Sequence, residues 1–242
     1  MKVNDDLYIL PISVEVGEWK SVLNLSLIVD PVHGAVLVDT AIPGKEDAID
    51  AALAEIGLSL KDVKHVIVTH QDIDHIGSLP AVKEATRADV YAHSVEVPYI
   101  EGRTKMVKQP TPESLAQNPA RKALFDQLAF TTVEHAVEDG QVLDFAGGVR
   151  VIFTPGHTPG HISLFLERSK TLITGDAMIS ADGKLAGLNE PATPDLPTAY
   201  ASIRKLAEEL PKVNAIVCYH GGLVTEDAAG QLQRVSTANA LQ

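Results

Sequence analysis

Four side chains that can bind a metal ion stand within six residues, in the order His70-Gln71-Asp72-Ile73-Asp74-His75. They directly follow the β-branched run 66–69, so we expect a strand that ends abruptly in a turn. On such a turn the four side chains can converge, and imidazole and carboxylate are ligands of divalent zinc, iron and manganese. The alternative is a polar turn in which Asp74 or Ser78 caps a following helix.

Three later residues repeat this placement at the ends of strand-like runs. His157 stands in a doubled Pro-Gly-His loop, 154–161, whose prolines stiffen the backbone while its glycines permit close approach. We expect this loop to hold one ligand, His157, and one supporting histidine, His161. Asp176 and His220 each follow a short apolar run, although a turn carboxylate and a loop histidine are the simpler interpretations of each alone.

The two halves of the chain share an order of several strands, a helix and then a strand that ends in polar residues. This order predicts an α/β fold with two sheets face to face, helices outside them and the polar residues at one edge. We expect one domain over 1–242, with the proline-rich segment 94–128 as a surface insertion near the site. Strands are expected at 7–12, 23–29, 35–38, 66–69, 89–92, 142–144, 149–153, 162–167, 171–173 and 215–219, and helices around 49–56, at 198–210 and from Thr225.

Composition excludes several classes of partner. A net charge of −12 repels phosphate backbones, and 5% aromatic residues leave few stacking surfaces, so we expect no nucleic acid partner. No leader-like or membrane-spanning apolar run is visible, and the single Cys218 allows no internal disulfide. We therefore expect a cytoplasmic protein without a membrane partner, in which Cys218 is a small buried hydrophobic residue.

Together these residues resemble the pattern of the metallo-β-lactamase superfamily. That pattern is a strand-end Asp, then HxHxDH, a His in a Pro-Gly-His loop, a bridging Asp and a late His. Here the matching positions, in the same order, are Asp39, the 70–75 cluster, His157, Asp176 and His220. The resemblance spans about residues 7–225 and implies a four-layer αββα sandwich with a binuclear metal site at one edge of the sheets.

The resemblance also implies a role for each matched residue. Asp39 and His161 would orient metal ligands, and Asp74 would take part in catalysis as well as in metal binding. The first metal would be held by His70, Asp72, His157 and Asp176, and the second by Asp74, His75, His220 and Asp176.

One position departs from the family pattern, because Asp72 replaces its second histidine. Flavodiiron proteins look similar in carrying an acid there and hold iron. Two divalent ions, three carboxylates and one hydroxide sum to zero charge, against +1 with histidine, so the site would be a weaker Lewis acid. The family resemblance favours zinc, and oxygen ligation makes iron or manganese an alternative. A further alternative is that Asp72 is too short to reach, leaving the first site weak or empty.

The resemblance implies a hydrolase in which a metal-bound hydroxide attacks an ester, thioester or lactone of a small-molecule substrate. The alternatives are an iron-dependent redox enzyme of the dioxygenase kind and a non-catalytic metal-binding module. Lactonases of the superfamily often carry Tyr where this chain has Ile179, and glutathione thioesterases carry late basic residues where it has only Arg234. Assembly as a homodimer is left open.

The other histidines match no metal position, and we expect structural or surface roles for them. His93, together with the segment 94–128 that follows it, could still line a substrate cleft. The remaining three are His33, His65 and His135.

Overall fold

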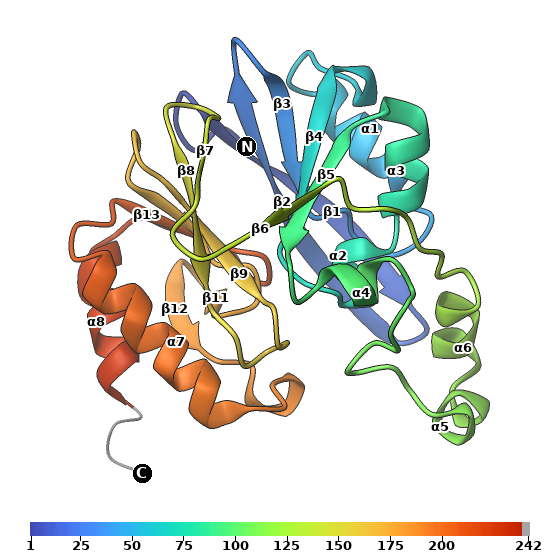
Figure 1. The fold of residues 1–242 in the computed structure, drawn as a ribbon. Coiled ribbons are helices and arrows are strands. Elements are labelled where there is room, and N and C mark those ends of the chain that lie inside the picture. Colours follow the sequence, from blue (N-terminus) through green and yellow to red (C-terminus); the bar gives the residue numbers. More distant parts are fainter. Residues whose placement is uncertain (239–242) are drawn as a thin grey trace.

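The computed structural model describes residues 1–238, and its first half contains a six-stranded sheet whose strands lie side by side in chain order (Figure 1). The first three strands pair in antiparallel fashion and the last three add in parallel. The strands are β1 (Leu7–Val16), β2 (Trp19–Asp30), β3 (Gly34–Val38), β4 (Val63–Val68), β5 (Asp89–His93) and β6 (His135–Val137).

The second half contains another six-stranded sheet, in the order β14-β13-β10-β9-β8-β7. Only β10 and β13 pair in parallel; the other pairs are antiparallel. The strands are β7 (Val142–Leu143), β8 (Val149–Phe153), β9 (Ile162–Leu166), β10 (Thr171–Ile173), β13 (Ala215–Cys218) and β14 (Gly222–Val224). A separate hairpin is formed by β11 (Ile179–Ala181) and β12 (Lys184–Gly187).

The two sheets pack face to face through fully buried aliphatic side chains. Val36, Val38 and Ile67 from the first sheet belong to the same apolar cluster as Leu164 and Val217 from the second. Successive side chains of a strand point to opposite faces, so each sheet also presents an outward apolar face. Both faces must be covered to remove them from water.

Helices cover those outer faces, which gives the four layers of the predicted αββα sandwich (Figure 1). On the first sheet, Ile49 of α1 (Glu46–Ala54) and Val82 of α3 (Leu79–Thr86) pack in one cluster. On the second sheet, Ile203 and Leu206 of α7 (Leu196–Glu209) and Leu232 of α8 (Ala228–Ala238) form another. The predicted fold class is confirmed.

Several elements differ from the expectation. The β1–β2 hairpin is longer than 7–12 and 23–29, because exposed residues continue its antiparallel pairing to Val16 and Trp19. The strands β6, β11, β12 and β14 were not expected; each is three or four residues long and exists through pairing with a neighbour. The last helix begins at Ala228 rather than Thr225, because Gly222–Val224 pairs with β13 first.

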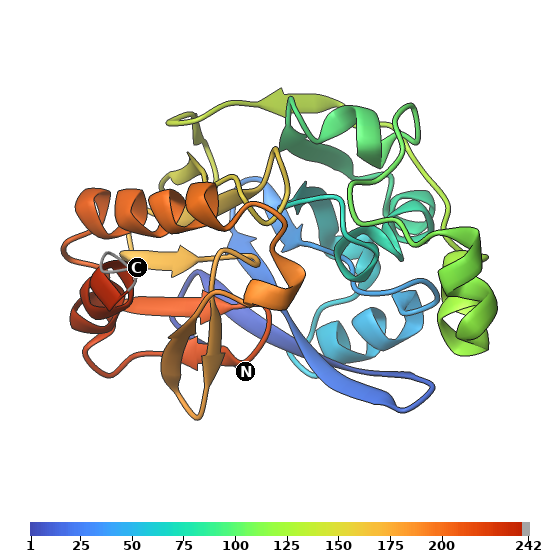
Figure 2. The ribbon, with the colours of Figure 1, turned by 90° about the horizontal axis from the view of Figure 1, so that it is seen from below.

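The segment 94–128 contains three short helices. They are α4 (Val97–Ile100), α5 (Pro112–Gln117) and α6 (Pro119–Phe125), each with a proline in its first turn. Figure 2 shows these short helices, in green, on the side of the molecule opposite α7 and α8. None of the helices within residues 1–238 has the length and apolar character needed to cross a membrane.

Candidate metal centre

Five loops at one edge of the sandwich bring the predicted site residues together. The parallel pairs β3–β4 and β10–β13 set the carboxyl ends of their strands at the same edge, and polar loops follow each of them. Asp39 follows β3, the 70–75 cluster follows β4, His157 lies between β8 and β9, Asp176 follows β10 and His220 follows β13. The structure therefore gathers residues separated by up to 181 positions.

Asp72 stands just before the short helix α2 (Ile73–Ile76), with extended backbone. Its carboxylate makes no capping bond to that helix, and the hydroxyl of Ser78 donates to the carbonyl of Ile42 instead of capping α3. One Asp72 oxygen lies 3.3 Å from Nε2 of His70 and 3.1 Å from Nε2 of His157. Asp72 is therefore long enough to reach the same point as these histidines. Asp74 lies inside α2 rather than at its N-terminus, and Ser78 makes no capping bond, so neither residue caps a helix as the alternative required.

The donor atoms form two groups that share Asp176. Its Oδ2 lies 3.3 Å from Nε2 of both His157 and His220, and its Oδ1 lies 3.3 Å from Nε2 of His75. The second group is completed by Asp74, whose Oδ2 is 3.4 Å from Nε2 of His220 and 3.9 Å from Nε2 of His75. Ligands bound tetrahedrally at about 2.1 Å are about 3.4 Å apart, so these separations fit metal ligands.

Unpaired buried atoms support the same interpretation. Nε2 of His70, Nε2 of His75 and Oδ1 of Asp176 are buried and make no hydrogen bond. A buried polar atom without a partner costs about 1–3 kcal/mol, and here three of them face one another. Sets of three donors that lie within 4.8 Å of one another occur in both groups. The residues present therefore fit a pair of divalent ions.

Asp39 orients one of these histidines from behind. Its Oδ2 accepts a 2.9 Å hydrogen bond from Nδ1 of His75, and the carboxylate also accepts from the backbone N–H and hydroxyl of Thr69, both at 2.8 Å. With Nδ1 paired to Asp39, Nε2 is the nitrogen of His75 that faces Asp176. Carboxylates placed in this way fix the tautomer and raise the basicity of metal-binding histidines.

His161 performs the equivalent task for Asp176. Its Nε2 accepts a 2.9 Å hydrogen bond from the backbone N–H of Asp176, and its Nδ1 is 2.9 Å from the hydroxyl of Thr154. Burial lowers the pKa of His161 to about 3, so the ring is neutral and can accept this bond. The ring of His161 also packs closely against Gly175, which has φ +53°, because a β-carbon at that position would lie only 2.8 Å from Nε2. His161 positions Asp176 and does not itself join the donor groups.

The charges of the site stabilise one another. Burial alone would lower the pKa of His220, but Asp176 and Asp74 outweigh it and raise that pKa to about 10. Burial likewise opposes ionisation of Asp72 and Asp176, yet neighbouring histidines hold the pKa of both carboxyls well below the usual range. The carboxylates are thus ionised at neutral pH, which is the state that binds metal.

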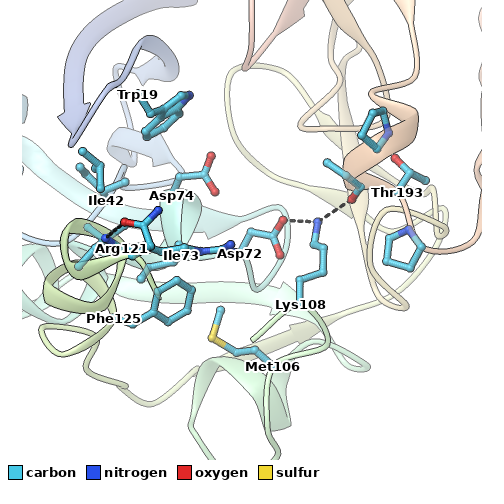
Figure 3. A pocket seen from close by; sticks show the side chains of 16 residues that line it. Trp19, Ile42, Asp72, Ile73, Asp74, Met106, Lys108, Arg121, Phe125 and Thr193 are labelled. Carbon is cyan, nitrogen blue, oxygen red and sulfur yellow. Dashed lines mark hydrogen bonds and ion pairs between the residues drawn. The ribbon is translucent and has the colours of Figure 1, made fainter. Parts of the chain in front are cut away.

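A cavity of about 610 Å³ opens beside the donor groups (Figure 3). Asp72 and Asp74 lie at its wall, so a molecule in the cavity would contact the two donor groups directly. Most of the lining is apolar, and two cationic side chains are present, Lys108 and Arg121. The other lining residues are Val16, Trp19, Ile42, Ile73, Met106, Asn118, Leu124, Phe125, Pro191, Ala192, Thr193 and Pro194.

Sequence reasoning missed two residues of the segment 94–128 that contact the donor loops. Glu96 is fully buried and accepts hydrogen bonds from the loops that carry Asp72 and His157. Burial raises the pKa of Glu96, while those hydrogen bonds oppose the shift. Lys108 contacts the carboxylate of Asp72. Neither stands in a motif, and nothing local distinguishes Lys108 from the other basic residues.

The four histidines for which we expected structural or surface roles lie apart from the two donor groups. His65 and His135 pack against Tyr91, and His93 stacks on Phe153 with ring centroids 4.4 Å apart. His93 does not line the cavity, whereas six residues between positions 106 and 125 of the following segment do. The remaining one, His33, is 3.9 Å from Asp144. Cys218 is buried, and burial raises the pKa of its thiol to about 12.

Comparison with known proteins places these residues in context. Residues 22–221 match the sequence family described as the metallo-beta-lactamase superfamily. The chain is 35% identical over 205 residues to the probable metallo-hydrolase YflN of Bacillus subtilis (strain 168), covering 78% of this chain and 76% of YflN. It is 25% identical over 203 residues to the hydroxyacylglutathione hydrolase GloC of Haemophilus influenzae, covering 84% and 87% respectively.

Solved structures show the same fold. The metallo-beta-lactamase family protein TTHA1429 from Thermus thermophilus superposes with a TM-score of 0.73 and 24% identity, covering 99% of this chain and 81% of that protein. A metallo-beta-lactamase from Pontibacter korlensis superposes with a TM-score of 0.70 and 19% identity, covering 98% and 97%.

Proposed function

Since the chain belongs to the metallo-beta-lactamase superfamily, a superfamily of metallo-hydrolases, we propose that it binds two divalent metal ions and hydrolyses an ester, thioester or lactone. One observation carries the proposal: the two donor groups share Asp176, and one carboxylate of each group, Asp72 or Asp74, lines a cavity large enough for a small molecule. His70, Asp72, His157 and Asp176 would hold the first ion, and Asp74, His75, His220 and Asp176 the second.

When bound, two such ions would supply an activated water molecule and polarise a substrate carbonyl. The protein supplies position and proton transfer. Asp74 lines the cavity, and α2 is held in place because the hydroxyl of Tyr219 donates a 2.5 Å hydrogen bond to the carbonyl of Asp74. We assign to the Asp74 carboxylate the transfer of a proton from the attacking water molecule to the leaving group, since it is both at the donor groups and accessible from the cavity.

The donor set bears on which divalent metals the site would prefer. Three carboxylates and four imidazoles make a harder set than the family pattern with histidine at position 72. Zinc is the metal that the family resemblance favours, and iron or manganese is the alternative that Asp72 supports. Competition among these metals is therefore part of the test.

The cavity favours a small substrate with an apolar part. Trp19, Met106 and Phe125 lie along it, and the protein's charge of −12 disfavours nucleic acid. GloC is named for a glutathione thioester, but the late basic residue Arg234 of this chain pairs with Asp227 at 2.9 Å and does not line the cavity. We therefore favour esters, thioesters or lactones other than those of glutathione.

A substrate panel tests the proposal. Protein freed of metal and then reloaded with zinc, manganese or iron would be assayed with aliphatic lactones, thioesters including S-lactoylglutathione, aryl esters and a phosphodiester. We expect metal-dependent turnover of carbonyl substrates and none of the phosphodiester. Oxygen consumption by the iron form without any hydrolysis would favour the redox alternative. Metal binding with neither activity would favour the non-catalytic one.

A further inference from the structure

Lys108 extends from the loop between α4 and α5 into the first donor group (Figure 3). Its Nζ contacts the carboxylate of Asp72, lies 2.7 Å from Nε2 of His157 and donates a 3.2 Å hydrogen bond to the carbonyl of Ala192. The side chain is 23% exposed and lines the cavity. A cationic group of the protein thus lies among the atoms that would hold the first metal.

The same atoms cannot serve both cations at once. A neutral imidazole has a single lone pair, on the nitrogen that carries no proton. The hydroxyl of Thr193 donates a 2.9 Å hydrogen bond to the carbonyl of Asn189, so Nδ1 of His157, which is 3.4 Å from that hydroxyl oxygen, is the donor to it and Nε2 is the acceptor. This lone pair can accept a hydrogen bond from the Lys108 ammonium or bind a metal, but not both.

The second donor group contains no such competitor. Within residues 1–238, no lysine or arginine forms an ion pair with Asp74 or Asp176; their charged neighbours are histidines. Nε2 of His75 is free of hydrogen bonds. The two groups therefore differ in one respect that bears directly on metal binding.

Lys108 is also held within reach of the first group by a backbone hydrogen bond of the preceding residue, Val107. The N–H of Val107 donates a 2.7 Å hydrogen bond to the side-chain oxygen of Gln71, which lies between two members of the donor cluster. Because this hydrogen bond keeps the Lys108 backbone close to the donor cluster, the ammonium group has a high effective concentration at the Asp72 carboxylate. Withdrawal of the side chain needs only rotation about its own bonds toward the cavity.

We propose that the Lys108 ammonium competes with the first metal, so that the two sites fill in order, the second site before the first. This inference rests on the proposed two-metal centre. One divalent ion at the second site with Lys108 in place balances the three carboxylates to zero charge. A second ion must displace Lys108 and leaves a charge of +1, which returns to zero only when a hydroxide also binds. No covalent bond changes in this exchange.

Titration of metal-free protein with zinc in a competing chelator tests the order of filling without any substrate. We expect two phases in the wild type. In Lys108→Met the weaker phase should tighten by about tenfold or more, since a charge-assisted hydrogen bond no longer has to be broken, while the tighter phase stays near its wild-type position. Lys105→Met is the matched control, because Lys105 lies on the same loop, is exposed and forms no ion pair within residues 1–238.

The assignment of the phases comes from His220→Ala, which should remove the tighter phase. If both metal ions bound to the wild type in a single phase, the two sites would have equal affinity and the inference would be overturned. An unchanged weaker phase in Lys108→Met would also overturn it. Either result would leave the two-metal centre intact. A weaker phase that loosens in Lys108→Met would show that Lys108 is a metal ligand rather than a competitor, and would overturn it as well. Absence of metal binding to folded wild-type protein would instead refute the proposed function.

Discussion

The carboxylate of Glu96 accepts two hydrogen bonds from Gln71, one from its backbone N–H at 3.0 Å and one from its side-chain amide at 2.9 Å. Its other oxygen accepts 2.7 Å hydrogen bonds from the hydroxyl of Thr158 and the N–H of Gly160. A single buried carboxylate therefore joins the loop of His70 and Asp72 to the loop of His157. Close packing is part of the arrangement, because a β-carbon on Gly160 would lie 2.7 Å from Glu96 Cγ.

Glu96→Gln should weaken both the fold and the first metal site. The glutamine amide has the same shape as the glutamate carboxylate. One of its two terminal groups is an NH₂, which would face the N–H of Gln71 or of Gly160 and could not accept a hydrogen bond from it. Leaving such a group unsatisfied costs about 1–3 kcal/mol, and loss of a supporting hydrogen bond lowers metal affinity by about 10- to 100-fold. Urea unfolding and zinc titration would measure the two effects. Glu84→Gln, at an exposed position of α3, is the control and should change neither.

His220→Ala and His75→Ala should each lower metal content by about one equivalent, because each removes a ligand of the second group. His220 is 23% exposed, so its loss should leave the fold largely intact, whereas His75→Ala also removes one of the hydrogen-bond donors to the buried carboxylate of Asp39. Elemental analysis and thermal unfolding would separate ligand loss from unfolding. His135→Ala, which removes a ring stacked on Tyr91, is the control. Equal metal loss in all three variants would contradict the assignment.

Asp72→His should shift metal preference toward zinc over manganese. The substitution removes one negative charge and replaces a hard oxygen with a softer nitrogen. Metal content after growth with equal zinc and manganese would be compared with that of the wild type and of Glu84→His, which alters an exposed acid. An unchanged ratio would mean that Asp72 is not a ligand, and the preference for harder metals would then have no support.

Asp30→Asn should destabilise the protein in a pH-dependent way. Burial alone would raise the pKa of Asp30, but N–H groups of His33, Ala146 and Val32 donate to its carboxylate and lower the pKa overall. A lowered folded-state pKa contributes stability that is present above the unfolded value, about 3.9, and is lost as the pH falls through the folded value. The variant should lose about 1–3 kcal/mol at pH 7 and progressively less below about pH 4.

Urea unfolding of the metal-free wild type and Asp30→Asn at several pH values would measure this difference. Asp144→Asn is the matched control, because the side chain of Asp144 is 98% exposed. A difference between wild type and Asp30→Asn that stays constant down to pH 3 would show that the charge of Asp30 does not contribute.

Local sequence was sufficient for an α/β fold with two facing sheets and outer helices, and for drawing attention to the 70–75 cluster, whereas the four-layer αββα sandwich was implied by the family resemblance. The short apolar runs of the strands, the helical spacing in 198–210 and the grouping of His70, Asp72, Asp74 and His75 all depend on neighbours a few residues away. The doubled Pro-Gly-His loop likewise predicted a rigid turn from its own composition. Such patterns can be predicted from the sequence because the interactions that produce them are local.

Other features were decided by tertiary structure, since their partners are distant in sequence. The short strands β6 and β14 exist only through pairing with strands that pack beside them. Glu96 meets Gly160 across 64 positions, and Lys108 meets His157 across 49, from a segment with no periodic pattern. Hydrogen bonds and charge contacts of this kind depend on three-dimensional proximity, which residue type and local spacing do not encode.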